Sequence, residues 1–234
     1  YLSVSGLVAA PYAAALATTS DEERRLGVTC IGIGGGTTTI AVFCEGQFVW
    51  ADSIPVGGNH ITFDIARALQ TPLAEAERIK ALYGTMVGAH SDGHELFSYP
   101  VVGEEEGLRY QTTKARLAEV VRPRLDHLAG LISDRLARSQ MARFAGDRVV
   151  LTGGTAQLVG IGEFMADALG RPVRVARPQQ LPGLPSNVTS PVFSTAAGLL
   201  ASLSAGHGAM TTRNRPAMAA GYLGRVGQWL REGF

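Results

Sequence analysis

Cysteine is scarce in this chain of 234 residues, which contains only Cys30 and Cys44. Neither belongs to a Cys-x-x-Cys or Cys/His pattern, which argues against a disulfide framework and against a structural zinc site. Both lie in β-branched segments, where a free cysteine acts as a small core hydrophobe. We therefore expect two buried thiols in a reducing compartment.

An excess of one charge and long apolar runs are also missing. Lys plus Arg number 21 against 20 Asp plus Glu, a net charge of +1, so the sequence lacks the basic excess of a nucleic-acid-binding protein. No run of about 18 uncharged apolar residues indicates a membrane span, and the first residues lack the basic region of a signal peptide. The chain begins at Tyr1 rather than Met, and we expect it to be part of a longer protein. The 46% hydrophobic content predicts a globular chain of one large or two small domains.

The first third of the chain shows three β-branched runs separated by turns. Strands are predicted at 28–33, 40–43 and 48–54, with a glycine-rich turn after the first. Strand, turn, strand is an antiparallel meander, whereas a phosphate-binding P-loop or a dinucleotide fold requires a helix after the glycines. Those two readings are excluded.

Helical periodicity follows residue 55. It predicts a helix at 61–69 capped by Asn59 or Thr62, and a second helix with Thr71 as N-cap and Pro72 in its first turn. A short strand is expected at 99–102. The longest helical pattern covers 113–144, and Pro123 is expected to kink or split it.

The remaining pattern alternates strands and helices, which indicates an α/β fold. Strands are predicted at 149–152 and 173–175, and helices at 161–169 and 194–203. The glycine turn 34–36 and the pair Gly153 and Gly154 both lie at strand ends, where backbone amides are open to an anionic ligand. Two such turns suit a nucleotide held at its phosphates and at its nucleoside.

These residues also carry a resemblance. The run 33–39 resembles the second phosphate-binding loop of the actin, chaperone and sugar-kinase superfamily, and 152–155 resembles its adenosine loop. A narrower and more specific match is carried by the segments 54–66, 71–77, 117–124 and 229–234. Together they are similar to the bacterial FtsA family of cell-division proteins, over the later half of that family's length.

The resemblance implies an actin-like (ribonuclease H-like) α/β domain with an inserted α+β subdomain and a C-terminal amphipathic helix. Subdomain 2A would comprise 1–55 and 145–203, subdomain 2B 56–144, a linker 204–220 and the helix 221–234. It implies a non-enzymatic adaptor with at most very weak ATPase activity, which tethers FtsZ filaments to the cytoplasmic face of the inner membrane at the septum. Recruitment of later division proteins and self-association into protofilaments of the intact protein are also implied.

Site residues follow from the resemblance. The implied ATP site has three parts: Gly34, Gly35, Gly36, Thr37 and Thr38 at the phosphates; Gly153 and Gly154 at the nucleoside; and Gly58, Asn59, Glu75 and Lys80 from subdomain 2B. Lys80 is equally well explained as a solvated helix charge. Mg²⁺ would accompany ATP, but Gly32 stands where the family has a metal-orienting Asp. We therefore expect weak or poorly metallated ATP binding. Thr39, where many relatives have Asp, is interpreted as tolerated variation.

Two implied partners are the FtsZ C-terminal tail and an anionic membrane surface. Arg124, then Arg116, with Arg122 nearby, are the candidates for contacts with the acidic tail. On a helical wheel the last segment presents one apolar side made of Leu223, Val226, Trp229, Leu230 and Phe234. The alternatives are a sugar- or acetate-kinase-type phosphotransferase of the same superfamily, for which no catalytic carboxylate is found, and a pilus-assembly actin-like protein.

Overall fold

The computed structural model describes residues 4, 6–87, 94–105, 107–179 and 189–204. Its centre is a five-stranded sheet in the order β3-β2-β1-β6-β7. The strands are β1 (Val28–Ile33), β2 (Thr38–Cys44), β3 (Gln47–Ile54), β6 (Val149–Thr152) and β7 (Val173–Val175). The expected antiparallel meander is present in β1, β2 and β3, and β6 and β7 extend it as parallel strands.

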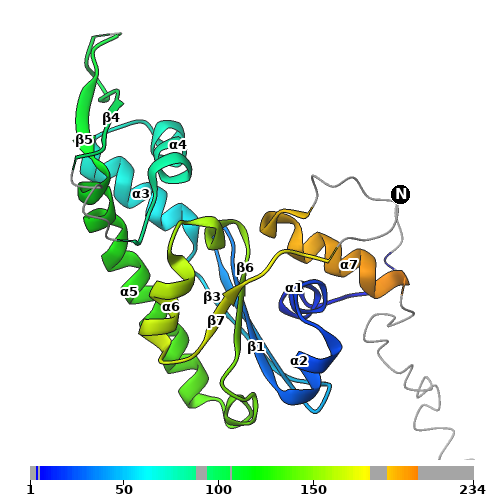
Figure 1. Cartoon of the computed structure of the whole chain (residues 1–234). Helices are drawn as coiled ribbons and strands as arrows, with labels where there is room; N and C mark the ends of the chain where they lie inside the picture. The colour runs from blue at the N-terminus through cyan, green and yellow to red at the C-terminus, as the bar shows by residue number, and fades with distance from the viewer. Residues whose placement is uncertain (1–3, 5, 88–93, 106, 180–188, 205–234) are drawn as a thin grey trace, which may run out of the picture.

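Helices cover both faces of this sheet (Figure 1). On one face, α1 (Ala10–Thr18) packs against a small core around Val28, Cys30 and Phe43, and α7 (Ser194–Ser204) lies on α1. On the other face, α5 (Lys114–Arg138) and α6 (Ile161–Leu169) pack against the main apolar core. A short helix, α2 (Asp21–Leu26), precedes β1. The mixed sheet with helices on both sides is the α/β class that the sequence pattern predicts.

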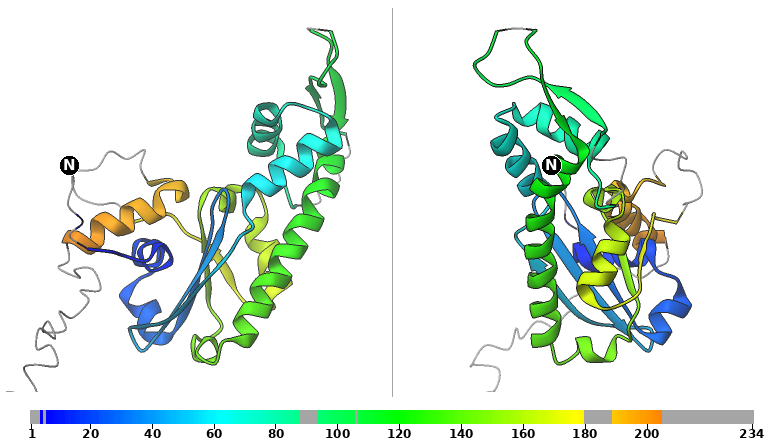
Figure 2. Two further views of the ribbon diagram at one scale, coloured as in Figure 1. Left: turned by 180° about the vertical axis from the view of Figure 1, so that it is seen from behind. Right: turned by 60° about the vertical axis from the view of Figure 1, so that its left-hand side comes forward.

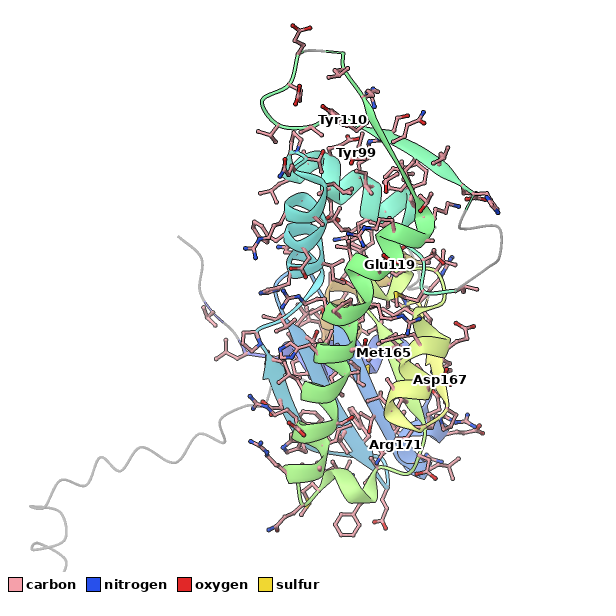
Figure 3. All side chains as sticks on the ribbon, turned by 90° about the vertical axis from the view of Figure 1, so that its left-hand side faces the viewer. Tyr99, Tyr110, Glu119, Met165, Asp167 and Arg171 are labelled. Carbon is pink, nitrogen blue, oxygen red and sulfur yellow. The ribbon has the colours of Figure 1, made fainter. Side chains whose placement is uncertain are left out.

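A second group of elements extends beyond one end of the sheet, as the two views of Figure 2 show. It contains α3 (Gly58–Leu69), α4 (Leu73–Tyr83) and a hairpin of β4 (Leu96–Tyr99) and β5 (Tyr110–Thr113). Tyr83 stacks on Phe97 at 4.5 Å between ring centroids, and this contact attaches the hairpin to α4. Helix α5 begins at the hairpin and runs down to the sheet, where Figure 3 shows it beside α6 near Met165 and Asp167.

Three expectations about helix boundaries were wrong. Of the kink or split expected at Pro123, the split is wrong: α5 runs from Lys114 to Arg138 with Pro123 on its exposed side, where water can solvate the Glu119 carbonyl. Thr71 is not an N-cap, since its hydroxyl donates to the Pro100 carbonyl at 2.7 Å and α4 begins at Leu73. Asn59 and Thr62 lie inside α3, whose N-cap is Gly57.

Strand and helix ends also differ in places from the pattern. The strand expected at 99–102 is β4, which ends at Tyr99, because Pro100 has no N–H to donate to a ladder. The long helix ends at Arg138, and the rest of the predicted span contains the short 3-10 helix η2 (Ala142–Phe144). Two further 3-10 helices, η3 (Gly154–Gln157) and η5 (Pro191–Phe193), follow β6 and precede α7.

Both cysteines are free, as expected from their spacing. Cys30 is fully enclosed between β1 and α1, and this burial raises the pKa of its thiol to about 11. A thiol with that pKa is protonated at neutral pH and behaves as an inert core residue. Cys44, at the end of β2, is only partly buried.

Candidate functional site

The glycine-rich turn between β1 and β2 presents backbone amides to solvent. The Gly34 amide donates to the Thr37 carbonyl at 2.9 Å and closes the turn. Gly35, Gly36 and Thr37 are exposed, and within the described part of the chain their amides donate to no acceptor. Successive free amides in a turn form a concave site for an anion.

The carbonyls of the same turn hold two other elements in place. Gly34 accepts hydrogen bonds from the Gly58 amide at 2.9 Å and from the Thr155 hydroxyl at 3.2 Å. Gly35 accepts from the Asn59 amide at 2.8 Å. The first turn of α3 and the start of η3 therefore meet at one point, the glycine turn.

This close approach leaves no room for side chains. A Cβ on Gly57 would lie 2.6 Å from the carbonyl oxygens of both Gly34 and Gly35, and a Cβ on Gly58 would lie 2.4 Å from Thr155 Oγ1. Gly153 has a φ of +96°, and its Cβ would lie 2.4 Å from the Ile33 carbonyl oxygen. Gly153 thus serves the backbone contact between β6 and β1 rather than offering a surface to a ligand.

A cavity of about 320 Å³ opens beside the turn. Its walls come from the glycine turn, α3, α4, η3 and η5, so residues far apart in sequence converge on it. The lining residues are Gly35, Gly58, Asn59, Glu77, Lys80, Ala81, Gly154, Thr155, Gln157, Leu158 and Val192.

Lys80 is the buried cation of this cavity and is not a solvated helix charge. It is only 8% exposed, and its ammonium donates to Gly58 O at 3.1 Å, Thr62 Oγ1 at 2.8 Å and Glu77 Oε2 at 2.6 Å. Burial alone would raise the pKa of the Glu77 carboxyl, but hydrogen bonds from Lys80 and Thr62 outweigh it and lower that pKa. Because an ammonium has three donors, Lys80 is saturated by protein groups and fixes the first turn of α3.

The structure brings together five of the residues proposed for ATP: Gly35, Gly58, Asn59, Lys80 and Gly154. Glu75 does not join them, because it forms an ion pair with Arg78 on the outside of α4. Thr38 is fully buried, and its hydroxyl donates to the Val56 carbonyl at 2.8 Å.

Sequence reasoning missed Glu77 and Thr155 as cavity residues. Glu77 lies three positions before Lys80, so helical spacing places both on one side of α4 and offered a signal. Thr155 belongs to the second glycine motif, but its hydrogen bond to Gly34 joins residues 121 positions apart, so no local sequence pattern could predict it.

The three arginines considered for an acidic tail each have a partner within the protein. Arg124 forms a two-point ion pair with Asp64 of α3, at 2.7 and 2.9 Å, which raises the arginine's pKa. Arg122 stacks over the Phe164 ring at 5.5 Å and links α5 to α6. Arg116 pairs with Glu119 at 2.8 Å, and both side chains are about two-thirds exposed (64% and 65%). Arg116 is thus far more exposed than Arg124, whose side chain is 30% exposed.

One expected feature lies outside the described residues, and two other features are absent from the described part of the chain. The former is the apolar side at 223–234. No group of three or more His, Cys, Asp or Glu side chains capable of holding a metal occurs in the part of the chain that is described. The helices of that part include none with the length and apolar character of a bilayer span.

Comparison with known proteins decides the family. The family model described as cell division protein FtsA matches residues 29–198. The chain belongs to the FtsA family. It is 42% identical to the cell division protein FtsA of Rhizobium meliloti, a match that covers all of this chain and 54% of that protein. With the FtsA of Escherichia coli K12 the identity is 33%, over all of this chain and 57% of the relative.

The fold is also similar to solved structures. MreB5 of Spiroplasma citri bound to ADP superimposes with a TM-score of 0.68 at 21% identity, over 85% of this chain and 59% of that one. At this identity the likeness establishes the actin-like fold alone. The chain spans about half the length of the curated relatives it matches.

Proposed function

We propose that the chain provides a cell-division adaptor with an actin-like ATP-binding core, which tethers FtsZ filaments to the cytoplasmic face of the bacterial inner membrane at the septum. The observation that carries the proposal is the glycine turn, whose Gly35 lines a cavity and donates its amide to no acceptor among the described residues, in a member of the FtsA family. Recruitment of later division proteins and protofilament formation by the intact protein are part of the same proposal.

The residues present fit a nucleotide. The amides of Gly35 and Gly36 would meet the phosphate oxygens, and Gly154 and Thr155 would border the nucleoside. A volume of about 320 Å³ is at the lower end of ordinary ligand sites. The structure with a similar fold, MreB5, has ADP bound according to its description.

The same geometry supports an adaptor rather than an enzyme. Among the described residues that line the cavity, the carboxylate is Glu77, and its Oε2 is engaged by Lys80 and Thr62. A carboxylate held in this way is poorly placed to accept a proton from water during hydrolysis. We therefore propose at most very weak ATPase activity, and membership of the FtsA family disfavours the sugar- or acetate-kinase alternative.

We propose that the division into subdomains follows the two groups of elements. The five-stranded sheet supports subdomain 2A at 1–55 and 145–203, and the separate hairpin with α3 and α4 supports subdomain 2B at 56–144. The proposed linker at 204–220 rests on a composition that includes Gly, Thr, Arg and Pro, and the proposed membrane helix at 221–234 on its amphipathic sequence pattern.

The FtsZ tail is proposed to bind along α5 of subdomain 2B. Arg116 is the strongest candidate, because its exposed ion pair with Glu119 costs little to exchange for an acidic peptide. Arg124 and Arg122 would contribute by keeping α5 against α3 and α6.

Fluorescence anisotropy with a labelled FtsZ tail peptide tests this surface. We expect Arg116→Glu to weaken binding about tenfold or more, as charge reversal against an acidic partner does. Arg138→Glu, an exposed arginine at the far end of the same helix, is the matched control and should bind like the parent. Equal dissociation constants for the parent and Arg116→Glu would remove Arg116 from the proposed interface.

A further inference from the structure

The place where a metal-orienting carboxylate would be needed is filled by another side chain. Gly32 and Thr39 face each other across β1 and β2, directly beside the glycine turn. A Cβ on Gly32 would lie 2.9 Å from Thr39 Oγ1, closer than real Cβ contacts. Thr39 Oγ1 also donates to the Gly32 carbonyl at 3.5 Å. Thr39 therefore occupies the space that a side chain at position 32 would require.

Three other oxygen-bearing side chains near the turn have hydrogen-bond partners within the protein. The Thr38 hydroxyl donates to Val56, and the Thr155 hydroxyl donates to Gly34. Glu77, the carboxylate among the described cavity residues, accepts from Lys80 and Thr62. Mg²⁺ in nucleotide sites is normally held by one or two carboxylates together with the phosphates. The described residues do not supply that set.

The polar groups left free at the turn favour an anion over a metal cation. Its free groups are amide N–H donors, which attract phosphate oxygens and repel a cation. Position 32 adds no negative charge to offset them.

We infer that this chain binds the nucleotide's polyphosphate through amide donors without requiring a metal ion, and that Gly32 and Thr39 act as a pair to remove the metal requirement. The inference rests on the proposed nucleotide-binding function. It also changes the interpretation of Thr39, which fills the carboxylate position and is more than a tolerated variation.

Calorimetric titration of the full chain with ATP, in excess EDTA and in Mg²⁺, provides the first test. We expect dissociation constants that agree within about twofold, because amide donors alone meet the phosphates. Tightening of about tenfold or more by Mg²⁺ would overturn the inference while leaving nucleotide binding intact. Absence of binding in both buffers would overturn the proposed nucleotide site and the inference with it.

The second test restores the carboxylate. In the double variant Gly32→Asp/Thr39→Ala the hydroxyl is gone, so a carboxylate has room, and we expect Mg²⁺ to tighten ATP binding about tenfold. Gly32→Asp alone should respond less, because Thr39 Oγ1 stands against its Cβ. Thr39→Ala alone is the matched control and should remain insensitive to Mg²⁺. An equal response of the single and double Asp variants would contradict the pairing, as would no response in either. Circular dichroism melts confirm that each variant folds.

Discussion

At the residue scale, the candidate site depends on positions without side chains. The first turn of α3 can reach the Gly34 and Gly35 carbonyls only because Gly57 and Gly58 present bare backbone to them. Gly36, in the glycine turn between β1 and β2, faces open space, where a Cβ would meet nothing within 4 Å. Glycines that look alike in the sequence therefore have different roles.

Gly57→Ala should lower the free energy of unfolding by about 1–3 kcal/mol, since two backbone carbonyls would have to move to admit a methyl group. Gly36→Ala is the control, and its effect should stay within about 0.5 kcal/mol. Urea denaturation followed by circular dichroism measures both. Equal losses for the two variants would show that the approach of α3 to the turn is not tight in solution.

Lys80 supports the same contact from the other side. Lys80→Met should cost about 1–3 kcal/mol of stability, because the Gly58 carbonyl and the Glu77 carboxylate each lose a buried donor and keep the Thr62 hydroxyl. Arg78→Met, which breaks an exposed ion pair on the same helix, should cost about 1 kcal/mol or less. Chemical denaturation of both variants decides the comparison, and a more stable Lys80→Met chain would refute the positioning role of Lys80.

The sequence predicted the kind of ligand that the site would bind better than it predicted which residues line the cavity. Lys80 could be read from the sequence either as a ligand-side cation or as a solvated charge, and its burial under α3 depends on tertiary packing. Glu75 and Glu77 are both acidic positions in the first half of α4, and only the packing of α4 on α3 shows which one faces the cavity. Such choices depend on contacts between elements and leave no local pattern.

At the element scale, the sequence at the start of α2 contains a helix-start signal from which α2 could have been predicted. Ser20 accepts from the Glu23 amide, and the Glu23 carboxylate accepts from the Ser20 amide, which makes a complete capping box. The Ser-x-x-Glu spacing is recognisable in sequence. Glu23 also accepts two hydrogen bonds from Arg174 of β7, so the cap joins α2 to the far strand of the sheet.

This arrangement predicts a pH dependence. The hydrogen bond from Arg174 holds the pKa of Glu23 below its usual value, although burial acts in the opposite direction. The resulting stability is fully present above the unfolded-state pKa of about 4.3 and is lost as the pH falls through the folded-state pKa.

Glu23→Gln should therefore lower the free energy of unfolding by about 0.5–1.5 kcal/mol at pH 7. This difference from the parent should vanish at pH values below the folded-state pKa of Glu23. Denaturation curves across this pH range measure the difference. Glu22→Gln, at the exposed neighbouring position, should show no such dependence. A difference for Glu23→Gln that persists unchanged into acid would exclude the charge as its cause.

Regular elements were largely predictable, and their ends were not. Helix 161–169 and strand 173–175 match the predicted bounds, because Gly160 and Gly170 flank the helix and Pro172 directly precedes the strand. The wrong boundaries occur where a long-range contact replaces the local rule, as when the Thr71 hydroxyl bonds the Pro100 carbonyl instead of capping α4.

At the scale of the whole molecule, the actin-like fold and the FtsA family agree with what the glycine turns and the narrower motifs predict. The fold alone does not identify the partners that bind its exposed surfaces. In the proposed tether, Arg116 of α5 would serve FtsZ and the amphipathic segment at 221–234 would serve lipid.

The central claim is that one chain connects an FtsZ tail to a membrane, and co-flotation tests it most directly. The full chain is mixed with anionic liposomes and a labelled FtsZ tail peptide, beside a version truncated after Ala220 and a Leu230→Glu variant. We predict that the full chain floats and carries the peptide with it, because the apolar side inserts at the lipid interface. The truncated and Leu230→Glu chains should stay at the bottom. A full chain that remains at the bottom, or that floats without the peptide, would contradict the tether.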